Sequence, residues 1–499
     1  MNDTARTTAN TNPYLAIGVR PFMNCCSVRT LHGGSLMLPQ VREAIAQASR
    51  YFVNLDELME AASKRIAELT GAECGIVTCG SAAAVALATC ACVAGNDPVK
   101  MLRLPFTDGW VNRVIMPKNQ RFAYDQAIRM VGTRIVEVDS IAELEAALKE
   151  PVAMVCILGT NEAESKVRLE EIVKRTKPLG IPILVDAASE HIERPSPWLV
   201  RGADLVIYSG GKFLRGPQTS GLLLGRKDLV QAAWRNASPH QAFGRPMKVS
   251  KEDVIGLLTA LEYWMEERDL GAEQNRWRDD CAEMAKPLAG LADVKTEVIE
   301  PSGVVRVPVL RVRWDPARIH LDGMGVRKRL LEGTPRVMID DNTALVDSIT
   351  LDPFQLEPGQ AAEVGRAIAG VLNAARAPAA EPAAAPAADI SGDWEVRVNF
   401  LYGERKHRVT LRQQGNSLAG DQHSTQFDGT VAGSLQANRV RMTFTTRYEG
   451  AVISYQLDGE VANGRMRGKV MLGGGMEGHV GPVNLAQFGT GDWQAVRLN

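Results

Sequence analysis

The chain has 499 residues, a formal net charge of -1 at neutral pH and a charged fraction of 23%. These values are ordinary for a soluble globular protein and provide no electrostatic basis for binding nucleic acid. The length predicts about three domains. We expect no membrane partner, because no apolar run reaches the ~18 residues of a transmembrane helix. Residues 1–13 are polar, so we expect a disordered N-terminus and no signal peptide.

The eight cysteines predict a reduced, cytoplasmic protein without a metal site. None of them shows the paired CxxC spacing of a zinc site, and most stand among apolar residues, where a thiol packs as a small hydrophobic group. Disulfides are rare in the cytoplasm. We therefore expect free thiols and no bound metal.

Apolar runs of strand length alternate with helical segments through the first half of the chain. The expected strands are 74–78, 113–116, 153–158, 181–185 and 204–208, and the helices expected between them include 141–148 and 169–176. Such alternation predicts an α/β fold with a mostly parallel sheet.

A turn of small residues follows the first of these strands. Gly80, Ser81 and Ala82 open a helix made largely of alanine. The free N–H groups at a helix N-terminus, together with a serine hydroxyl, favour an anion. The same residues also fit an ordinary capped core helix, and the two interpretations are compatible.

Two polar residues, Asp186 and Lys212, follow two neighbouring apolar runs. They stand 212 − 186 = 26 positions apart, which is enough for a crossover between parallel strands. Ligands of open α/β sheets bind beyond the carboxyl ends of the strands. Pyridoxal phosphate requires a lysine for its Schiff base and a carboxylate beside its ring nitrogen. The pair therefore indicates a pyridoxal phosphate site.

The segment DLVIYSGGKFLRGPQTSGLLLGRKDLV, from Asp204 to Val230, resembles the cofactor-lysine region of fold-type I pyridoxal phosphate enzymes. Together with GRPMKVSKEDVIGLLTALE (Gly244 to Glu262), it is similar to the selenocysteine synthase-like family, and most of all to its D-glucosaminate-6-phosphate ammonia-lyase group. The resemblance covers roughly residues 14–375. It implies a large domain with a mostly parallel seven-stranded sheet, and a small α/β domain.

The resemblance also implies roles for individual residues. Lys212 would hold the cofactor and act as the catalytic base, and Asp186 would pair with the ring nitrogen. The cofactor phosphate would lie against Gly80, Ser81, Ala82 and Ser209. Relatives often carry a histidine over the ring face, whereas Asn119, Gln120 and Arg121 stand at this place here, and we assign the role to Gln120.

Substrate contacts and an oligomer follow from the same resemblance. Asn24, Arg245 and Arg336 are the candidate substrate residues, although a solvated surface arginine explains Arg336 equally well. Active sites of this fold are usually completed across a two-fold interface. We therefore expect a homodimer or larger assembly, in which Thr219 reaches the neighbour's phosphate.

The C-terminal part has a different character. Residues 377–388, APAAEPAAAPAA, predict a semi-rigid spacer, and short alternating runs after Ser391 predict about eight strands of an antiparallel, lipocalin-like barrel. Trp394 and Trp493, near the two ends of this part, are expected to pack together where the barrel closes. We expect the spacer to decouple the barrel mechanically, and the barrel to stabilise the oligomer or its solubility, or to bind a small apolar ligand, without supplying catalytic groups.

The predicted boundaries follow from these features. They are a small domain of residues 14–50 and 246–376, a large cofactor-binding domain of 51–245, a linker of 377–390 and a barrel of 391–499. In the small domain, 252–286 is expected to be helical, 304–312 and 348–351 to be strands, and 358–374 to be a helix.

The sequence thus predicts a pyridoxal phosphate-dependent lyase. By resemblance, it would abstract the α-proton of a polar amino acid and eliminate a β-substituent, to give a 2-oxo acid and ammonia. A racemase is equally compatible with Lys212. Selenium transfer on a charged tRNA is less favoured, because the chain has no net positive charge. A non-catalytic binding protein on this scaffold would not need both Lys212 and Asp186.

Overall fold

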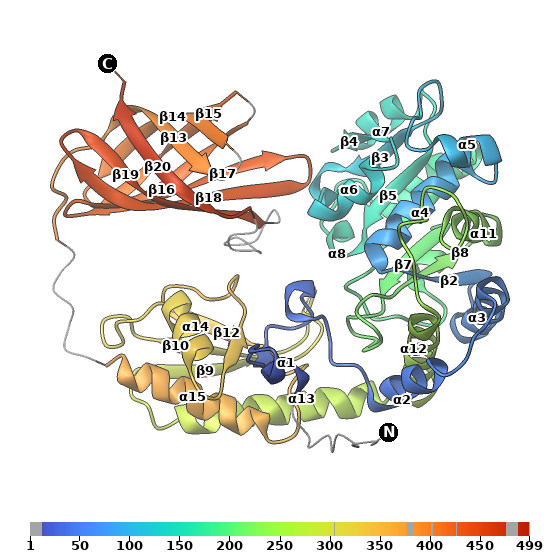
Figure 1. Cartoon of the computed structure of the whole chain (residues 1–499), viewed down its shortest axis with the longest axis horizontal. Helices are drawn as coiled ribbons and strands as arrows, with labels where there is room; N and C mark the ends of the chain where they lie inside the picture. Colours follow the sequence, from blue (N-terminus) through green and yellow to red (C-terminus); the bar gives the residue numbers. More distant parts are fainter. Residues whose placement is uncertain are drawn as a thin grey trace, which may run out of the picture. The chain divides into compact units, whose positions relative to one another are not determined.

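The computed structural model describes residues 12–303, 305–376, 384–400, 403–425, 427–475 and 488–498. They form two compact units, each continuous in space but not in sequence (Figure 1). The first unit joins the N-terminal part up to Ser27 with residues 269–381, and the second joins 28–268 with 382–499. Most of the predicted disordered N-terminus and residues 377–383 of the predicted linker lie outside the described residues.

A seven-stranded sheet forms the centre of the second unit. Its order is β2-β8-β7-β6-β5-β3-β4, in which only β8 runs antiparallel to its neighbours. The strands are β2 (Cys74–Thr78), β3 (Arg113–Pro117), β4 (Arg134–Val138), β5 (Met154–Leu158), β6 (Ile183–Asp186), β7 (Leu205–Ser209) and β8 (Gly221–Gly225). Apart from the half-exposed edge strand β4, their Val, Ile and Leu runs are almost wholly buried, as is typical of a parallel sheet covered on both faces. The predicted α/β fold is confirmed.

Helices of this unit surround the sheet (Figure 1). They are α2 (Pro39–Ala48), α3 (Leu55–Thr70), α4 (Ser81–Ala94), α5 (Pro98–Arg103), α6 (Gln126–Arg129), α7 (Ile141–Ala147), α8 (Gly159–Glu162), α9 (Leu169–Thr176), α10 (Pro197–Val200), α11 (Lys227–Asn236) and α12 (Lys251–Glu262). Single 3₁₀ turns are η1 (Thr30–His32), η2 (Lys118–Gln120), η3 (Ala123–Asp125) and η4 (Lys177–Leu179), and η5 (Tyr263–Glu267) is a π-helical turn. Almost every residue of α4 is buried, because its small side chains let it pack between β8 and α11.

The first unit has a smaller core of its own. Its helices are α1 (Pro13–Ala16), α13 (Leu270–Ala285), η6 (Lys286–Leu288), α14 (Gly323–Glu332) and α15 (Gln360–Ala374). A sheet of order β12-β10-β9 combines β9 (Val294–Ile299), β10 (Val309–Trp314) and β12 (Ser348–Leu351), and β1 (Met23–Cys25) pairs in parallel with β11 (Val337–Ile339).

The compact units divide the chain at other residues than the predicted boundaries of the small domain. The division falls after Ser27 and after Arg268, whereas boundaries after residues 50 and 245 were predicted. The reason is that α2 packs against α12, where Leu38, Val41 and Ala260 share a buried cluster. This packing keeps both helices with the large sheet.

Two predicted elements of the small domain also differ. The helix predicted for 252–286 is broken between α12 and α13 by η5 and the extended residue Arg268. The strand predicted for 304–312 begins only at Val309, whereas Val304 lies outside the described residues. By contrast, the strand predicted for 348–351 and the helix predicted for 358–374 are found as β12 and α15.

The C-terminal strands form a closed antiparallel barrel. In order they are β13 (Gly392–Phe400), β14 (Gly403–Gln414), β15 (Ser417–Ser424), β16 (Asp428–Gln436), β17 (Arg439–Tyr448), β18 (Ala451–Ala462), β19 (Arg465–Gly475) and β20 (Thr490–Arg497). Each strand pairs with the next, and β20 returns to pair with β13. Because the sheet closes on itself, it has no open edge strand. The predicted eight-stranded barrel is confirmed.

Trp394 and Trp493 lie on the two strands that close the barrel, as predicted. Both are buried, with exposed fractions of 1% and 2%. The indole of Trp394 donates to the carbonyl of Ile390 at 2.9 Å, and that of Trp493 donates to the carbonyl of Asp458 at 3.2 Å. Each indole therefore has a backbone partner of its own.

None of the helices within the described ranges is long and apolar enough to cross a membrane. All eight cysteines are free thiols. No group of three or more metal-ligating side chains is found among the described residues.

We expect Trp493→Ala to destabilise the barrel by about 3–5 kcal/mol, because it removes a large buried side chain and leaves a cavity. Urea unfolding of the full chain, followed by circular dichroism of the β-sheet, measures the loss. Val496→Ala on the same strand is the control, since Val496 is 38% exposed and should cost less than about 1 kcal/mol. Equal losses for both variants would contradict this assignment of the barrel core.

Candidate functional site

Asp186 and Lys212 come from the carboxyl ends of adjacent parallel strands. Asp186 is the last residue of β6 and lies opposite Ile207 of β7. Lys212 stands in the turn that follows Ser209, the last residue of β7. Since parallel strands end at the same edge of a sheet, the fold brings these two residues to one place.

The amine of Lys212 is held in a defined position. Its Nζ donates a hydrogen bond to Oγ of Ser189 at 2.7 Å. Burial lowers the pKa of Lys212, and the charge of Asp186 opposes this effect without cancelling it. A lowered pKa increases the fraction of neutral amine, which is the form that acts as nucleophile and base.

The carboxyl group of Asp186 is buried beside this amine. Only 6% of the residue is exposed, and Oδ1 accepts the N–H of Ala188 at 3.0 Å. Burial raises the pKa of Asp186, whereas the Ala188 N–H and the charge of Lys212 lower it. A buried carboxylate of this kind can stabilise a positive charge that is placed next to it.

Three strands bring the predicted phosphate residues together. Gly221, the first residue of β8, pairs with Thr78 of β2 on one side and with Ser209 of β7 on the other. A Cβ atom on Gly221 would lie 2.6 Å from the backbone nitrogen of Ser81, so that only glycine fits there. Gly80 takes a left-handed φ of 84° just before α4, and no side chain caps this helix.

The open start of α4 is therefore suited to an anion. Its first N–H groups have no side-chain partner, and nothing lies within 4 Å of the position that a Cβ of Gly80 would occupy. The aligned peptide dipoles of a helix favour negative charge at this end. Ser81, Ala82 and Ser209 are all partly or fully exposed around it.

The chain resembles several enzymes over most of its length. It is 32% identical over 382 residues to a 5'-C-glycyluridine monooxygenase-decarboxylase of a Streptomyces species, which covers 74% of this chain and 94% of the relative. It is 29% identical over 363 residues to the D-glucosaminate-6-phosphate ammonia lyase of Salmonella typhimurium, and this alignment covers 70% of this chain and 95% of the lyase. It is 24% identical over 407 residues to the L-seryl-tRNA(Sec) selenium transferase of Moorella thermoacetica, and this alignment covers 72% of this chain and 83% of the transferase. The chain belongs to the selenocysteine synthase-like family.

A solved structure supports this membership. D-glucosaminate-6-phosphate ammonia-lyase matches with a TM-score of 0.65 and 26% identity, over 74% of this chain and 100% of that one. No model of a protein family matches the chain. The large sheet and the small unit are thus those of a selenocysteine synthase-like enzyme, close to the ammonia-lyase group.

Enzymes of the selenocysteine synthase-like family depend on pyridoxal phosphate, and the site fits this cofactor. It combines a buried amine, a buried carboxylate and an uncapped helix N-terminus at one edge of the sheet. These are the three groups that the aldehyde, the ring nitrogen and the phosphate require.

Gln120 is wholly buried at the end of η2. Its Oε1 accepts the N–H of Leu158 at 2.9 Å, which connects it to the end of β5. Its Nε2 has no hydrogen-bond partner among the described residues. The ring-covering role of Gln120 stays a prediction.

Three neighbours of the site were missed in the sequence. Ser189, which accepts the hydrogen bond of Lys212, lies only three residues after Asp186, and this short spacing could have marked it as a neighbour of the site. Tyr124 on η3 is 51% exposed, and partial desolvation of its hydroxyl together with the charge of Asp186 raises its pKa. His191 packs edge-on against Phe213, the residue after Lys212, with ring centroids 4.9 Å apart.

The other predicted contacts are not brought to Lys212 by the described geometry. Asn24 donates to the carbonyl of Ser27 at 2.9 Å, and Arg336 donates to the carbonyl of Arg20 at 2.8 Å; all four belong to the first unit. Arg245 is exposed in the second unit. Their substrate roles stay predictions.

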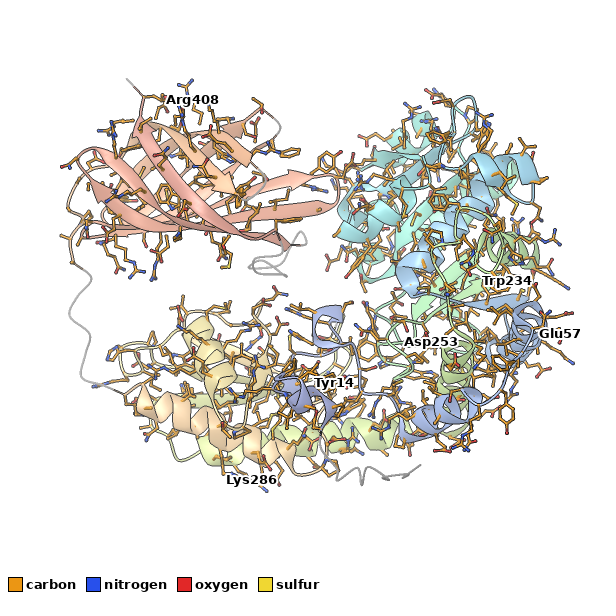
Figure 2. All side chains as sticks on the ribbon, in the orientation of Figure 1. Tyr14, Glu57, Trp234, Asp253, Lys286 and Arg408 are labelled. Atoms are coloured by element: carbon orange, nitrogen blue, oxygen red, sulfur yellow. The ribbon has the colours of Figure 1, made fainter. Side chains whose placement is uncertain are left out.

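Thr219, the predicted link to a second subunit, is exposed between Lys212 and β8. Its hydroxyl donates to Oδ2 of Asp253 at 2.9 Å. Asp253 stands on α12 and is labelled in Figure 2. The exposure of Thr219 is compatible with the predicted homo-oligomer, which itself stays a prediction.

The lowered pKa of Lys212 can be measured on the cofactor-free chain. Labelling by an amine-specific acylating reagent at a series of pH values, read by mass spectrometry, should show a midpoint for Lys212 below that of the exposed Lys149. Asp186→Asn should move the Lys212 midpoint to still lower pH, because it removes the charge that raises this pKa. A midpoint that stays the same or rises in Asp186→Asn would contradict the coupling.

The close approach at Gly221 gives a second prediction. Gly221→Ala should weaken pyridoxal phosphate binding by at least about tenfold, because the added Cβ displaces the backbone of Gly80 and Ser81. Equilibrium titration followed by absorbance measures the effect. Gly370→Ala is the matched control, since nothing lies within 4 Å of its Cβ position. Unchanged affinity in Gly221→Ala would remove this turn from the cofactor site.

Proposed function

We propose that the chain is a pyridoxal phosphate-dependent lyase, which converts a polar amino acid into a 2-oxo acid and ammonia. The observation that carries this proposal is the buried pair of Lys212 and Asp186 at adjacent strand ends. The matches to an ammonia lyase over 70% of the chain and to its solved structure support the reaction class.

The residues of the site would share the work of holding the cofactor. Lys212 Nζ would anchor it, the carboxylate of Asp186 would keep its ring nitrogen protonated, and the start of α4 at Gly80 and Ser81 would take its phosphate. When bound, pyridoxal phosphate would supply an electron sink for the electron pair left at the substrate Cα.

Lys212 would then move the proton. With substrate bound, its free Nζ could take the proton from Cα, because burial lowers the pKa of the amine and so leaves part of it unprotonated. The hydrogen bond to Ser189 fixes where Nζ lies. Loss of a β-hydroxyl as water leaves an enamine, whose imine form takes up one water to give the 2-oxo acid and ammonia. These reaction steps consume no oxidant.

A second candidate follows from the Streptomyces relative. Its name describes a monooxygenase-decarboxylase that acts on a glycyl-substituted uridine. The same lysine would serve such a reaction, because it also begins at the Cα atom of an amino acid unit. It would differ from the lyase in consuming oxygen and releasing carbon dioxide.

One panel of candidate substrates distinguishes a lyase from a monooxygenase-decarboxylase and a racemase. D- and L-amino acids with polar β-substituents, and amino acid-substituted nucleosides, are supplied to the cofactor-loaded protein while 2-oxo acid, ammonia, oxygen and carbon dioxide are followed. The lyase should release 2-oxo acid and ammonia under nitrogen as well as in air. Turnover that requires oxygen would favour the second candidate, and inverted amino acid without either product would indicate a racemase.

On the substrate found in this way, Lys212→Ala should lower kcat by about 10²–10⁴-fold or more, because the general base is lost. Asp186→Asn should retain the cofactor but lower kcat by at least tenfold, because a neutral amide no longer keeps the ring nitrogen protonated. Lys149→Ala, a change at an exposed lysine, is the control. Wild-type turnover in Lys212→Ala would refute the proposed role.

A further inference from the structure

The hairpin between β17 and β18 connects the barrel to the catalytic sheet domain. Its tip is formed by Tyr448, Glu449 and Gly450, where Glu449 takes a left-handed φ of 52°. The tip lies against η3, within the same compact unit. This contact is at odds with the expectation that the spacer decouples the barrel mechanically.

Arg121 is the centre of this contact. Only 2% of its side chain is exposed, and it pairs with Asp125 at 2.6 Å and with Glu137. Its third partner is Glu449 of the barrel. The hydrogen bond from Arg121 lowers the pKa of Glu449, so the pair stays charged at neutral pH. A buried guanidinium that loses such a partner is left with unsatisfied N–H groups.

The hairpin also fits by shape. A Cβ atom on Gly450 would overlap the carbonyl oxygen of Phe122 and lie 2.5 Å from Oδ2 of Asp125. Only glycine therefore permits this approach. Beside it, the guanidinium of Arg129 lies 5.8 Å from the ring centroid of Tyr448, within the range of a cation–π contact.

The segment that the hairpin contacts, residues 120–125, lies beside the candidate cofactor site. Gln120 precedes Arg121 and is tied to the end of β5, and Tyr124 lies close enough to Asp186 for its carboxylate to raise the tyrosine pKa. A hydrogen-bonded barrel tip thus holds a short, irregular segment that has little regular structure of its own.

We propose that the β17–β18 hairpin is a positioning element of the catalytic site: Glu449 and Gly450 hold residues 120–125 in the arrangement that the cofactor requires. The cofactor part of this inference rests on the proposed function. The hairpin touches neither Lys212 nor Asp186 among its described contacts, so it acts through Arg121 and η3.

The experiment uses the full chain with Glu449→Gln and Gly450→Ala. We expect hydrogen exchange of amides 120–125 to accelerate at least tenfold in the cofactor-free protein, and pyridoxal phosphate to bind at least fivefold more weakly. Glu460→Gln, at the exposed far end of β18, and Gly290→Ala, with nothing within 4 Å of its Cβ position, should change neither quantity by more than twofold.

A coupling measurement identifies the pair itself. Glu449→Gln introduced into Arg121→Gln should weaken cofactor binding by less than a further twofold, because the contact is already lost. A purely stabilising contact would lower the unfolding temperature while cofactor affinity stays within twofold of wild type, and this result would overturn the positioning role. Unchanged exchange in both hairpin variants would overturn the contact.

The test separates this inference from the proposed function. If the wild-type chain binds no pyridoxal phosphate, the lyase proposal fails and the cofactor part of the inference falls with it. Hydrogen exchange would then still decide whether the hairpin holds residues 120–125. If wild type binds the cofactor and the hairpin variants bind it equally well, the lyase proposal stands and the positioning role is wrong.

Discussion

A half-buried lysine and a buried aspartate at the carboxyl ends of two adjacent parallel strands are the constraint on which this site depends. Desolvation disfavours the charged form of both groups, so each depends on fixed neighbours. Lys212 is stabilised by the hydroxyl of Ser189 and the charge of Asp186. Asp186 is stabilised by the N–H of Ala188 and the charge of Lys212. The parallel sheet supplies the rigidity that holds these neighbours. The same desolvation keeps part of the amine neutral and therefore reactive.

Close backbone approaches complete the candidate site. Gly221 passes so near the Gly80–Ser81 peptide that no side chain fits, and the alanine-rich α4 packs tightly enough to aim its uncapped start at the same edge. Gly221 is thus required by distance, whereas Gly80 is required by its positive φ. An anion can then be bound by backbone N–H groups without a dedicated basic side chain.

The barrel is both an independent core and a neighbour of the catalytic domain. Its strands close on each other and bury two tryptophans, so it needs no edge partner. Its one described charged link to the sheet domain, Glu449 with Arg121, joins residues 328 positions apart. A buried arginine shared by three carboxylates makes that link costly to break.

The sequence by itself determined what depends on local pattern. Apolar runs predicted the strands of the large sheet, period-two alternation predicted those of the barrel, and the Gly80 and Ser209–Lys212 turns marked the candidate cofactor residues, because these signals lie within a few neighbouring positions. Tertiary structure alone decided that Tyr124 comes within the electrostatic influence of Asp186, that α2 belongs with α12, and that the buried Arg121 pairs with Glu449. In the sequence Arg121 is indistinguishable from a solvated arginine, since its burial depends on residues that reach it only when distant elements pack.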